Sequence, residues 1–214
     1  MAKRALGFDT GFNSGYITVN RCEVNLAPAN SLPSVALASH RGCGNTWMRH
    51  LIEQTTGIYS GSLGNSSFML ENGFLGELES RTSGRTVVTK THGINFKKIN
   101  MFDKVILIFR NPYRCFLAEF NRQQTGSKTE RALATSFNSK AWQSFIHRQF
   151  SRWEVFAKNW LTSNLPKLVV HYEDLEDNLI HELRRISRFL NVTSFESRLS
   201  CVMKNTEGRF HRTT

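Results

Sequence analysis

Four short apolar segments recur along the chain, and longer amphipathic segments separate them. The apolar segments cover residues 33–39, 86–90, 104–109 and 167–171, and each is followed by polar residues. Short runs rich in Val, Ile and Leu are typical of strands that are buried on both faces of a sheet. We therefore predict four strands of one mostly parallel sheet.

Apolar side chains at helical spacing predict helices between and after these strands. Besides the helix that follows the first strand, we expect helices at residues 112–122, 140–163 and 178–190, the last of them ended by Asn191. The long helix carries an aromatic stripe that is typical of a core: Trp142, Phe145, Ile146, Trp153, Phe156 and Trp160. Alternating strands and helices predict the α/β class, with a three-layer, mostly parallel sheet flanked by helices and ligands bound at the carboxyl ends of the strands.

The domain organisation follows from length and polarity. The chain has 214 residues with 40% hydrophobic content, which suits one good core. Residues 1–32 are polar and are predicted to be an extended N-terminal lead-in, and residues 33–214 form the domain. Two long polar stretches, residues 59–85 and 123–139, are expected to be lids or walls for a substrate. No apolar run approaches the ~20 residues that span a bilayer, so no membrane span and a soluble chain are expected.

The net charge points to an anionic partner. Lys and Arg number 28 against 17 Asp and Glu, which gives a formal charge of +11. A nucleotide, an acidic glycan, nucleic acid or a lipid surface would all suit this charge. The basic residues are scattered and no zinc-finger or RNA-binding signature occurs, so nucleic acid is disfavoured. No Cys and His cluster has metal-ligand spacing, so no metal is predicted.

The four cysteines divide into two pairs by position. Cys22 and Cys201 lie outside the predicted core elements and could pair, whereas Cys43 and Cys115 lie inside motifs and are expected to be thiols. The sequons at Asn65 and Asn191 favour a secretory compartment.

The turn after the first strand has the features of an anion site. Gly42 and Gly44 let the chain approach a ligand closely, and the helix that follows exposes the amides of Gly44, Asn45 and Thr46 at its positive end. Side chains at helical spacing, and a glycine that can end the helix, follow this turn: Trp47, Leu51, Ile52, Thr55 and Gly57. An ordinary connection from strand to helix is the alternative.

Polar residues at two other strand ends extend this site. Arg110 directly follows a strand, before an Asn that can cap the next helix and a Pro that suits its first turn. Its guanidinium could hold a second phosphate in bidentate fashion. Lys90 and His92 reach the same edge. His92 could be a general base, and Lys90 could offset negative charge on a transferred group.

The order of these motifs resembles the sulfotransferases that use 3'-phosphoadenosine 5'-phosphosulfate (PAPS). The segments GNTWMRHLIEQTTGIYSGS, RNPYRCFLAEFNR and NTEGRFHR are most similar to the sulfotransferase domain of the WSC-domain-containing proteins. The resemblance covers residues 34–212. It implies the P-loop-like sulfotransferase fold, with PAPS as the donor and no metal.

The resemblance also implies roles for individual residues. The turn formed by Gly42, Cys43, Gly44, Asn45 and Thr46 would hold the 5'-phosphosulfate. The remaining nucleotide contacts would be Trp47 stacked on adenine, Arg110 on the 3'-phosphate, Tyr172 beside the base, and Lys204, Arg209 and Arg212 closing the nucleotide from the C-terminal loop. His92 would be the general base, with help from Lys90 and Arg41 as the 5'-phosphate leaves.

Three positions depart from the family pattern. Gly42 stands where many relatives carry Lys or Arg, so Arg41 is the nearest cation. Ala118 replaces a serine that commonly contacts the 3'-phosphate, and Arg114 stands where Asp is common. These departures leave open a catalytically weakened nucleotide or polyanion binder on the same fold. A P-loop kinase is a further alternative, but GCGNTW lacks the lysine of that motif.

The expected reaction is in-line sulfuryl transfer to a hydroxyl of an acceptor. We expect the acceptor to be an anionic or neutral glycan or glycoconjugate, and the resemblance suggests sialylated glycans, which suits the basic charge. It also implies the Golgi lumen, with an N-terminal membrane anchor that this chain starts after or lacks; the cytoplasm is the alternative.

Overall fold

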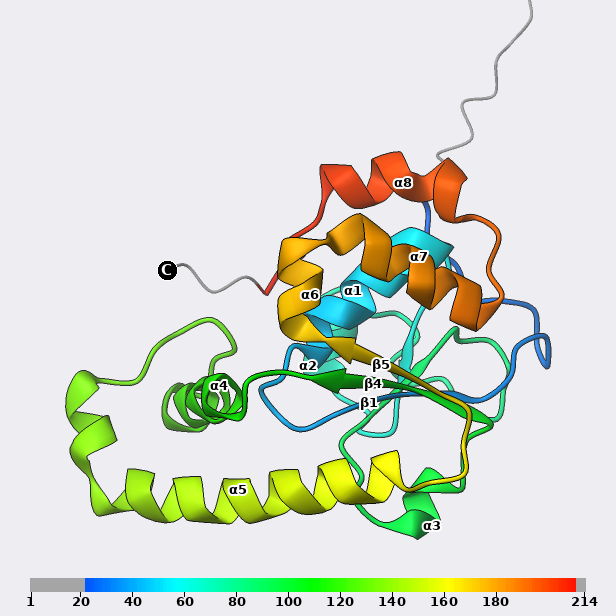
Figure 1. Cartoon of the computed structure of the whole chain (residues 1–214). Coiled ribbons are helices and arrows are strands. Elements are labelled where there is room, and N and C mark those ends of the chain that lie inside the picture. Colours follow the sequence, from blue (N-terminus) through cyan, green and yellow to red (C-terminus); the bar gives the residue numbers. More distant parts are fainter. Residues whose placement is uncertain (1–21, 211–214) are drawn as a thin grey trace, which may run out of the picture.

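The computed structural model describes residues 22–210 and shows a parallel five-stranded sheet between two layers of helices (Figure 1). The strand order is β2-β3-β1-β4-β5, and every neighbouring pair is parallel. The strands are β1 (Val35–Ser39), β2 (Gly61–Ser62), β3 (Thr89–Thr91), β4 (Lys104–Phe109) and β5 (Lys167–His171).

Helices cover both faces of the sheet. α1 (Asn45–Thr56), α6 (Tyr172–Asp177), α7 (Leu179–Leu190) and α8 (Phe195–Lys204) lie above it in Figure 1. The long α5 (Lys140–Leu161) and the short α3 (Phe96–Ile99) lie below it, and α4 (Pro112–Thr125) lies beside the strand ends. The long polar stretches contain α2 (Ser67–Glu71) and the 3-10 helix η1 (Ala134–Asn138).

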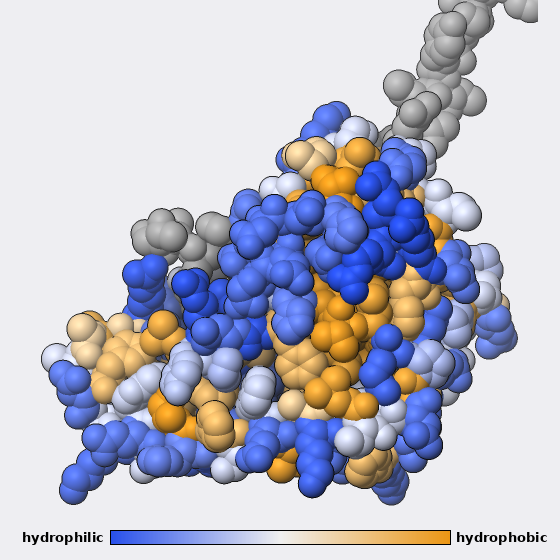
Figure 2. All heavy atoms as spheres, viewed as in Figure 1, coloured by the Kyte–Doolittle hydropathy of each residue, from blue (hydrophilic) through white to orange (hydrophobic). Residues whose placement is uncertain are grey.

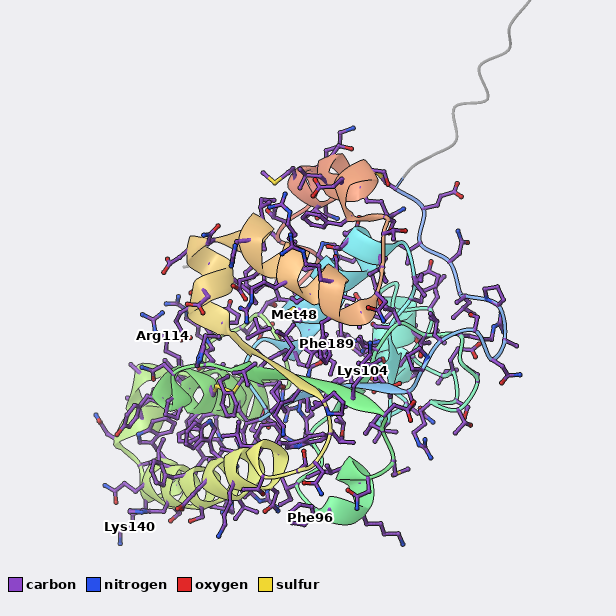
Figure 3. All side chains as sticks on the ribbon, turned by 45° about the vertical axis from the view of Figure 1, so that its right-hand side comes forward. Met48, Phe96, Lys104, Arg114, Lys140 and Phe189 are labelled. Carbon is purple, nitrogen blue, oxygen red and sulfur yellow. A yellow bond between two sulfur atoms is a disulfide. The ribbon has the colours of Figure 1, made fainter. Side chains whose placement is uncertain are left out.

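The alternation of side chains along the central strands builds two cores. Leu37 and Ile106 point to the face that α1, α7 and α8 cover, whereas Ala38 and Leu107 point to the face that α5 covers. All of β1 is buried, which explains why its sequence is continuously apolar. In Figure 3, Met48 lies between α1 and the sheet, and the start of β4 at Lys104 meets Phe189 of α7.

The α/β fold class is confirmed, and most element positions follow the prediction. The central strands β1 and β4 form where they are expected. Asn191 ends α7, as predicted, and adopts the left-handed conformation. The strand expected at residues 86–90 forms later, as Thr89–Thr91, because only this part pairs with β1. Six elements are not predicted from the sequence: β2, α2, α3, η1, α6 and α8. Residues 1–21 of the predicted lead-in lie outside the described residues. In the part that is described, Asn25 forms an isolated parallel β-bridge with Ile58.

The prediction for the cysteines is half right. Cys22 and Cys201 form a disulfide, as expected. The prediction that Cys43 and Cys115 are thiols is wrong, because they form a second disulfide. Gly42, with φ +80, turns the loop directly onto the first turns of α4. The two Cα atoms are therefore 4.7 Å apart although 72 positions separate them in sequence, and this distance lies within the range that a disulfide spans.

Candidate functional site

A large cleft opens at the carboxyl ends of the parallel strands. Its volume is ≈ 1620 Å³, and it is lined from the start of α1, the end of β3, α4, the start of α6 and residues 205–210. Pockets for a single small ligand measure about 300–1,000 Å³, so this cleft is larger than a typical site for one small ligand. Figure 2 shows the side of the molecule where β5 forms the sheet edge. The surface there is hydrophilic over α7, and an apolar area lies beneath that helix.

The wall at the start of α1 is made of backbone. Gly44, with φ +88, precedes the helix and has no side chain to cap it. The first helical hydrogen bond is donated by the Met48 amide to the Gly44 carbonyl over 3.0 Å, so the amides of Asn45, Thr46 and Trp47 precede it. With no acidic residue in the first turn of α1, this positive helix end suits an anion.

Two residues of the predicted turn serve the fold with their side chains. Asn45 is buried, and its Nδ2 donates to the Leu37 carbonyl and to Ser39 Oγ, both at 3.1 Å. These bonds fasten the helix start to β1 through Nδ2, whereas Asn45 Oδ1 is buried and has no hydrogen-bond partner among residues 22–210. Cys43 is buried in its disulfide and is not among the described residues that line the cleft.

An aromatic and cationic stack lies beside the turn. The Tyr172 ring lies 5.1 Å from that of Trp47, and the Arg110 guanidinium lies 3.8 Å from the Tyr172 ring centre. Arg110 donates one long hydrogen bond, 3.5 Å, to the Gly42 carbonyl. Its Nε is buried and has no partner among residues 22–210. A buried donor without a partner costs free energy, so this group is ready to bind an acceptor that a ligand supplies.

Residues 205–210 are fastened across α1 by two side chains. Trp47 Nε1 donates to the Thr206 carbonyl and His50 Nε2 contacts the Asn205 carbonyl, each at 2.7 Å. Arg209 lines the cleft. Lys204 is exposed at the end of α8 and is not among the described cleft-lining residues. Arg212 lies outside the described residues.

His92 stands at the end of β3 in a defined tautomer. Its Nδ1 lies 2.8 Å from the Ser39 carbonyl, which can only accept a hydrogen bond, so Nδ1 carries the proton and Nε2 is left as the acceptor. Burial, together with the charge of Lys90, lowers the pKa of His92 to about 3. The imidazole is therefore neutral at physiological pH, as a general base must be before it takes a proton.

Lys90 and Arg41 both line the cleft with His92. Burial, together with the nearby charge of Arg49, lowers the pKa of Lys90 to about 8. Lys90 and His92 are two positions apart on an extended segment and so reach the same side of the sheet. The structure thus brings together the three residues that the sequence analysis proposed for catalysis.

The start of α4 carries the positions that depart from the family pattern. Asn111 caps this helix by accepting from the amides of Tyr113 and Arg114, as expected. Arg114 and Ala118 both line the cleft. Gly42 cannot be replaced by a residue with a side chain, because its Cβ would lie 2.1 Å from the Cys115 carbonyl oxygen.

Several cleft residues were missed by the sequence analysis. Glu119 is buried in α4 and accepts hydrogen bonds from Arg122 and Gln123. Burial raises the pKa of this carboxyl, but those hydrogen bonds outweigh burial and lower it overall. Lys128, from the loop after α4, lies 4.8 Å from the Phe210 ring centre, and burial lowers its pKa to about 8. Their positions depend on how α4 and the following loop fold over the sheet, and no local pattern contains that information.

A buried ion pair is linked through Ser60 to Glu53, which lines the cleft. Arg49 and Glu77 are both 0% exposed and pair at 2.6 Å. Arg49 also donates to Ser60, and Ser60 donates to Glu53. Burial raises the pKa of Glu53 to about 7. A charged residue within an amphipathic helix usually faces solvent, which is why the sequence analysis gave Arg49 and Glu53 no role.

Residues 22–210 contain neither a metal-binding cluster nor a helix that could span a membrane. No group of three or more His, Cys, Asp or Glu side chains is arranged to hold a metal ion. No helix in that part of the chain combines the length and apolar character that a membrane span requires.

Comparison with known proteins agrees with this architecture. The chain is 34% identical over 215 residues to WSCD family member CG9164 of Drosophila melanogaster, covering 98% of this chain and 66% of that protein. It is 36% identical over 182 residues to WSCD family member GA21586 of Drosophila pseudoobscura pseudoobscura, and the match covers 83% of this chain and 56% of that protein. The chain therefore spans less than two thirds of the length of these relatives.

Solved structures share the fold. Mouse sulfotransferase SULT7A1 complexed with PAP has a TM-score of 0.56 at 17% identity, covering 81% of this chain and 64% of that one. Retinol dehydratase in complex with androsterone and inactive cofactor PAP has a TM-score of 0.50 at 16% identity, with the same coverage. The family model described as "Sulfotransferase domain" matches residues 32–209. The P-loop-like fold and the resemblance found in the sequence are thus confirmed, and this chain belongs to the sulfotransferase domain family.

Proposed function

We propose that this domain transfers the sulfuryl group of PAPS to a hydroxyl of a glycan acceptor, with sialylated glycans as the first candidates to test. The observation that carries this proposal is the pair of anion positions in one cleft. One is the start of α1 with its early amides, and the other is Arg110 with its buried, unpartnered Nε. A nucleotide with phosphate groups at its 5' and 3' positions supplies an anion for each.

The aromatic residues between these positions suit the base. Trp47 and Tyr172 line the cleft with their rings tilted by 55°. An adenine ring can stack on Trp47 while Tyr172 holds the Arg110 guanidinium by a cation–π contact. Arg209 reaches the same cleft from residues 205–210 and adds positive charge at its mouth.

His92 would act as the general base through Nε2. The Ser39 carbonyl fixes the tautomer, and neutral imidazole takes the proton of the acceptor hydroxyl. A pKa of about 3 describes the free protein. Anionic ligands nearby favour the imidazolium form and so raise this pKa towards a value suited to proton transfer. Lys90 and Arg41 would offset the charge that develops as the 5'-phosphate leaves.

The rest of the cleft is suited to an acidic acceptor. Arg122, Lys128 and Arg131 line it from α4 and the loop that follows. The two disulfides favour an oxidising compartment, in line with a place in the Golgi lumen rather than the cytoplasm. Nucleic acid is not proposed as a partner.

A second candidate function is nucleotide or polyanion binding with slow catalysis. It is favoured by Gly42, because the closeness of the Cys115 carbonyl excludes any cationic side chain at that position. Ala118 also removes one hydroxyl donor. A rate measurement separates an active enzyme from a slow, nucleotide-binding one, since both of these require the nucleotide to bind.

The test uses the purified domain and radiolabelled sulfate in PAPS, offered to a panel of sialylated and neutral glycans. Transfer to a glycan, lost in His92→Ala, supports the first candidate. Binding of adenosine 3',5'-bisphosphate (PAP) without transfer to any member of the panel supports the second. Calorimetry that detects no PAP binding would exclude the first candidate and a slow nucleotide-dependent enzyme, and heparin retention without PAP binding would instead favour a polyanion binder.

A further inference from the structure

We propose that the disulfide between Cys43 and Cys115 is a positioning element for the nucleotide, and that the thiol–disulfide state of this pair sets the affinity for PAP. The inference rests on the proposed function, since it concerns the turn that would hold the 5'-phosphosulfate. It assigns a role to two residues that contact no ligand themselves.

Three contacts between the turn and α4 converge at one point. The disulfide joins Cys43, which directly precedes the cap residue of α1, to Cys115 in the second turn of α4. A Cβ at Gly42 would lie 2.1 Å from the Cys115 carbonyl oxygen, so the backbones touch. Arg110, just before α4, donates to the Gly42 carbonyl over 3.5 Å. The covalent bond is by far the strongest of these contacts.

The turn has weak hydrogen bonds of its own. The Cys43 amide donates to the His40 carbonyl over 3.4 Å, near the upper limit for a hydrogen bond. Gly42 and Gly44 both hold a positive φ, and glycine is the residue that loses most backbone freedom when it is fixed. A turn of this composition needs contacts with the rest of the molecule to keep one conformation. The Asn45 side chain fastens its α1 end to β1, and the disulfide restrains it against α4.

The disulfide joins the two segments that carry the proposed anion positions. The turn leads into the α1 amides, and α4 follows Arg110. Breaking the bond therefore lets the 5' end of the site move relative to the 3' end. The reduced protein must order the turn again when it binds the nucleotide, and this cost weakens binding.

The chemistry is a two-electron exchange with a dithiol reductant. The sulfur–sulfur bond takes two electrons and two protons and becomes two thiols, while the dithiol is oxidised to its own disulfide. Cys43 and Cys115 are 1% and 0% exposed, so the reductant reaches them only when the turn opens. A nucleotide that holds the turn closed therefore protects the bond.

Thermodynamic linkage makes the proposal quantitative. If the disulfide strengthens PAP binding by a given factor, PAP must shift the dithiol–disulfide equilibrium towards the disulfide by the same factor. We expect roughly a tenfold factor, the equivalent of fixing about one further backbone residue on binding.

The test measures PAP affinity by calorimetry for the oxidised domain, the dithiothreitol-reduced domain and Cys43→Ser/Cys115→Ser. The matched control is Cys22→Ser/Cys201→Ser, which removes the disulfide whose residues are not among the described cleft-lining residues. A second measurement follows the oxidised fraction of the Cys43 and Cys115 pair in dithiothreitol redox buffers with and without PAP. Far-UV circular dichroism and the unfolding temperature of each sample show whether it is folded.

We expect the reduced protein and Cys43→Ser/Cys115→Ser to bind PAP more weakly than the oxidised protein, and reoxidation to restore the affinity of the reduced protein. We also expect PAP to shift the dithiol–disulfide equilibrium by the same factor as the change in affinity. Equal affinity of the oxidised and reduced proteins would overturn the inference and leave the proposed function intact. If Cys43→Ser/Cys115→Ser does not fold, the redox midpoint of the wild type still decides, since a midpoint that PAP does not move contradicts the proposal. Failure of the oxidised wild type to bind PAP would instead reject the proposed function.

Discussion

Replacing Arg110 by alanine tests the proposed binding of the 3'-phosphate by this residue, separately from its contribution to the stability of the fold. In the free protein Arg110 makes one long hydrogen bond to Gly42 and a cation–π contact with Tyr172. The loss of the cation–π contact costs about 0.5–2 kcal/mol. Removal of the buried, unpartnered Nε also removes its desolvation penalty, which stabilises the fold by about 1–3 kcal/mol. The two effects oppose each other, so we expect the free energy of unfolding to fall by no more than about 1 kcal/mol.

Nucleotide binding should respond far more strongly. A guanidinium that binds a phosphate in bidentate fashion makes two charge-assisted hydrogen bonds, each worth about 1.5–3 kcal/mol. Their loss corresponds to PAP binding that is roughly 100-fold weaker or more. Adenosine 5'-phosphate lacks the 3'-phosphate, so Arg110→Ala should change its affinity less than about threefold, within the uncertainty of such comparisons.

The assay is calorimetry with both nucleotides on the wild type and the variant, and the decisive quantity is the ratio of their affinities. Arg148→Ala is the control for net charge, because Arg148 is exposed on α5 and is not among the described cleft-lining residues. The assignment fails if Arg110→Ala weakens the binding of both nucleotides equally, since the arginine would then contribute only to the electrostatic potential of the cleft. Unchanged preference for PAP in Arg110→Ala would place the 3'-phosphate elsewhere.

Four further outcomes are expected. His92→Ala should lower kcat by about 10²–10⁴ with PAP affinity nearly unchanged, and equal effects on both quantities would contradict a general base. Because the pKa of His92 falls from 6.5 to about 3 on folding, the unfolded chain binds more protons between these values. Stability should therefore fall as the pH drops through this range, and His92→Gln should flatten this part of the unfolding profile. Gly44→Ala should destabilise the domain and weaken PAP binding, because its Cβ would lie 2.4 Å from the Tyr172 ring. Gly126→Ala, at φ +72 with nothing within 4 Å, is the control for backbone strain alone, and equal losses for the two variants would refute the clash. Glu77→Gln should cost about 3–5 kcal/mol of stability by leaving Arg49 buried without its ion pair, as measured by chemical unfolding.

The sheet could be predicted because its central strands are short, apolar and buried on both faces. Each ends at a polar residue that the parallel arrangement carries to one edge, so Arg110, His92 and the turn before α1 were placed together from sequence alone. The strand β2 has two residues and no pattern of its own, and it exists only because β3 offers it a partner. α6 was missed because its six residues are mostly polar.

The parts of the site that escaped prediction depend on contacts between distant segments. Lys128 reaches the cleft because the loop after α4 folds towards Phe68 and Phe210. Arg49 is buried because Glu77, which lies 28 positions later, neutralises it. Such pairings leave no periodic trace in the chain, since each partner alone has the character of an ordinary surface residue.

The distance between the two anion positions is fixed by the same packing that excludes a cation at Gly42. The turn can rest on α4 only because Gly42 has no side chain, and that contact brings Cys43 within reach of Cys115. A lysine at this position would need the turn to stand away from α4, which would break the contact and move the α1 amides away from Arg110. This chain therefore combines a covalent link beside its two proposed anion positions with the positive charge of Arg41 and Lys90. The rate of sulfuryl transfer in this domain should depend on those two side chains rather than on the turn itself.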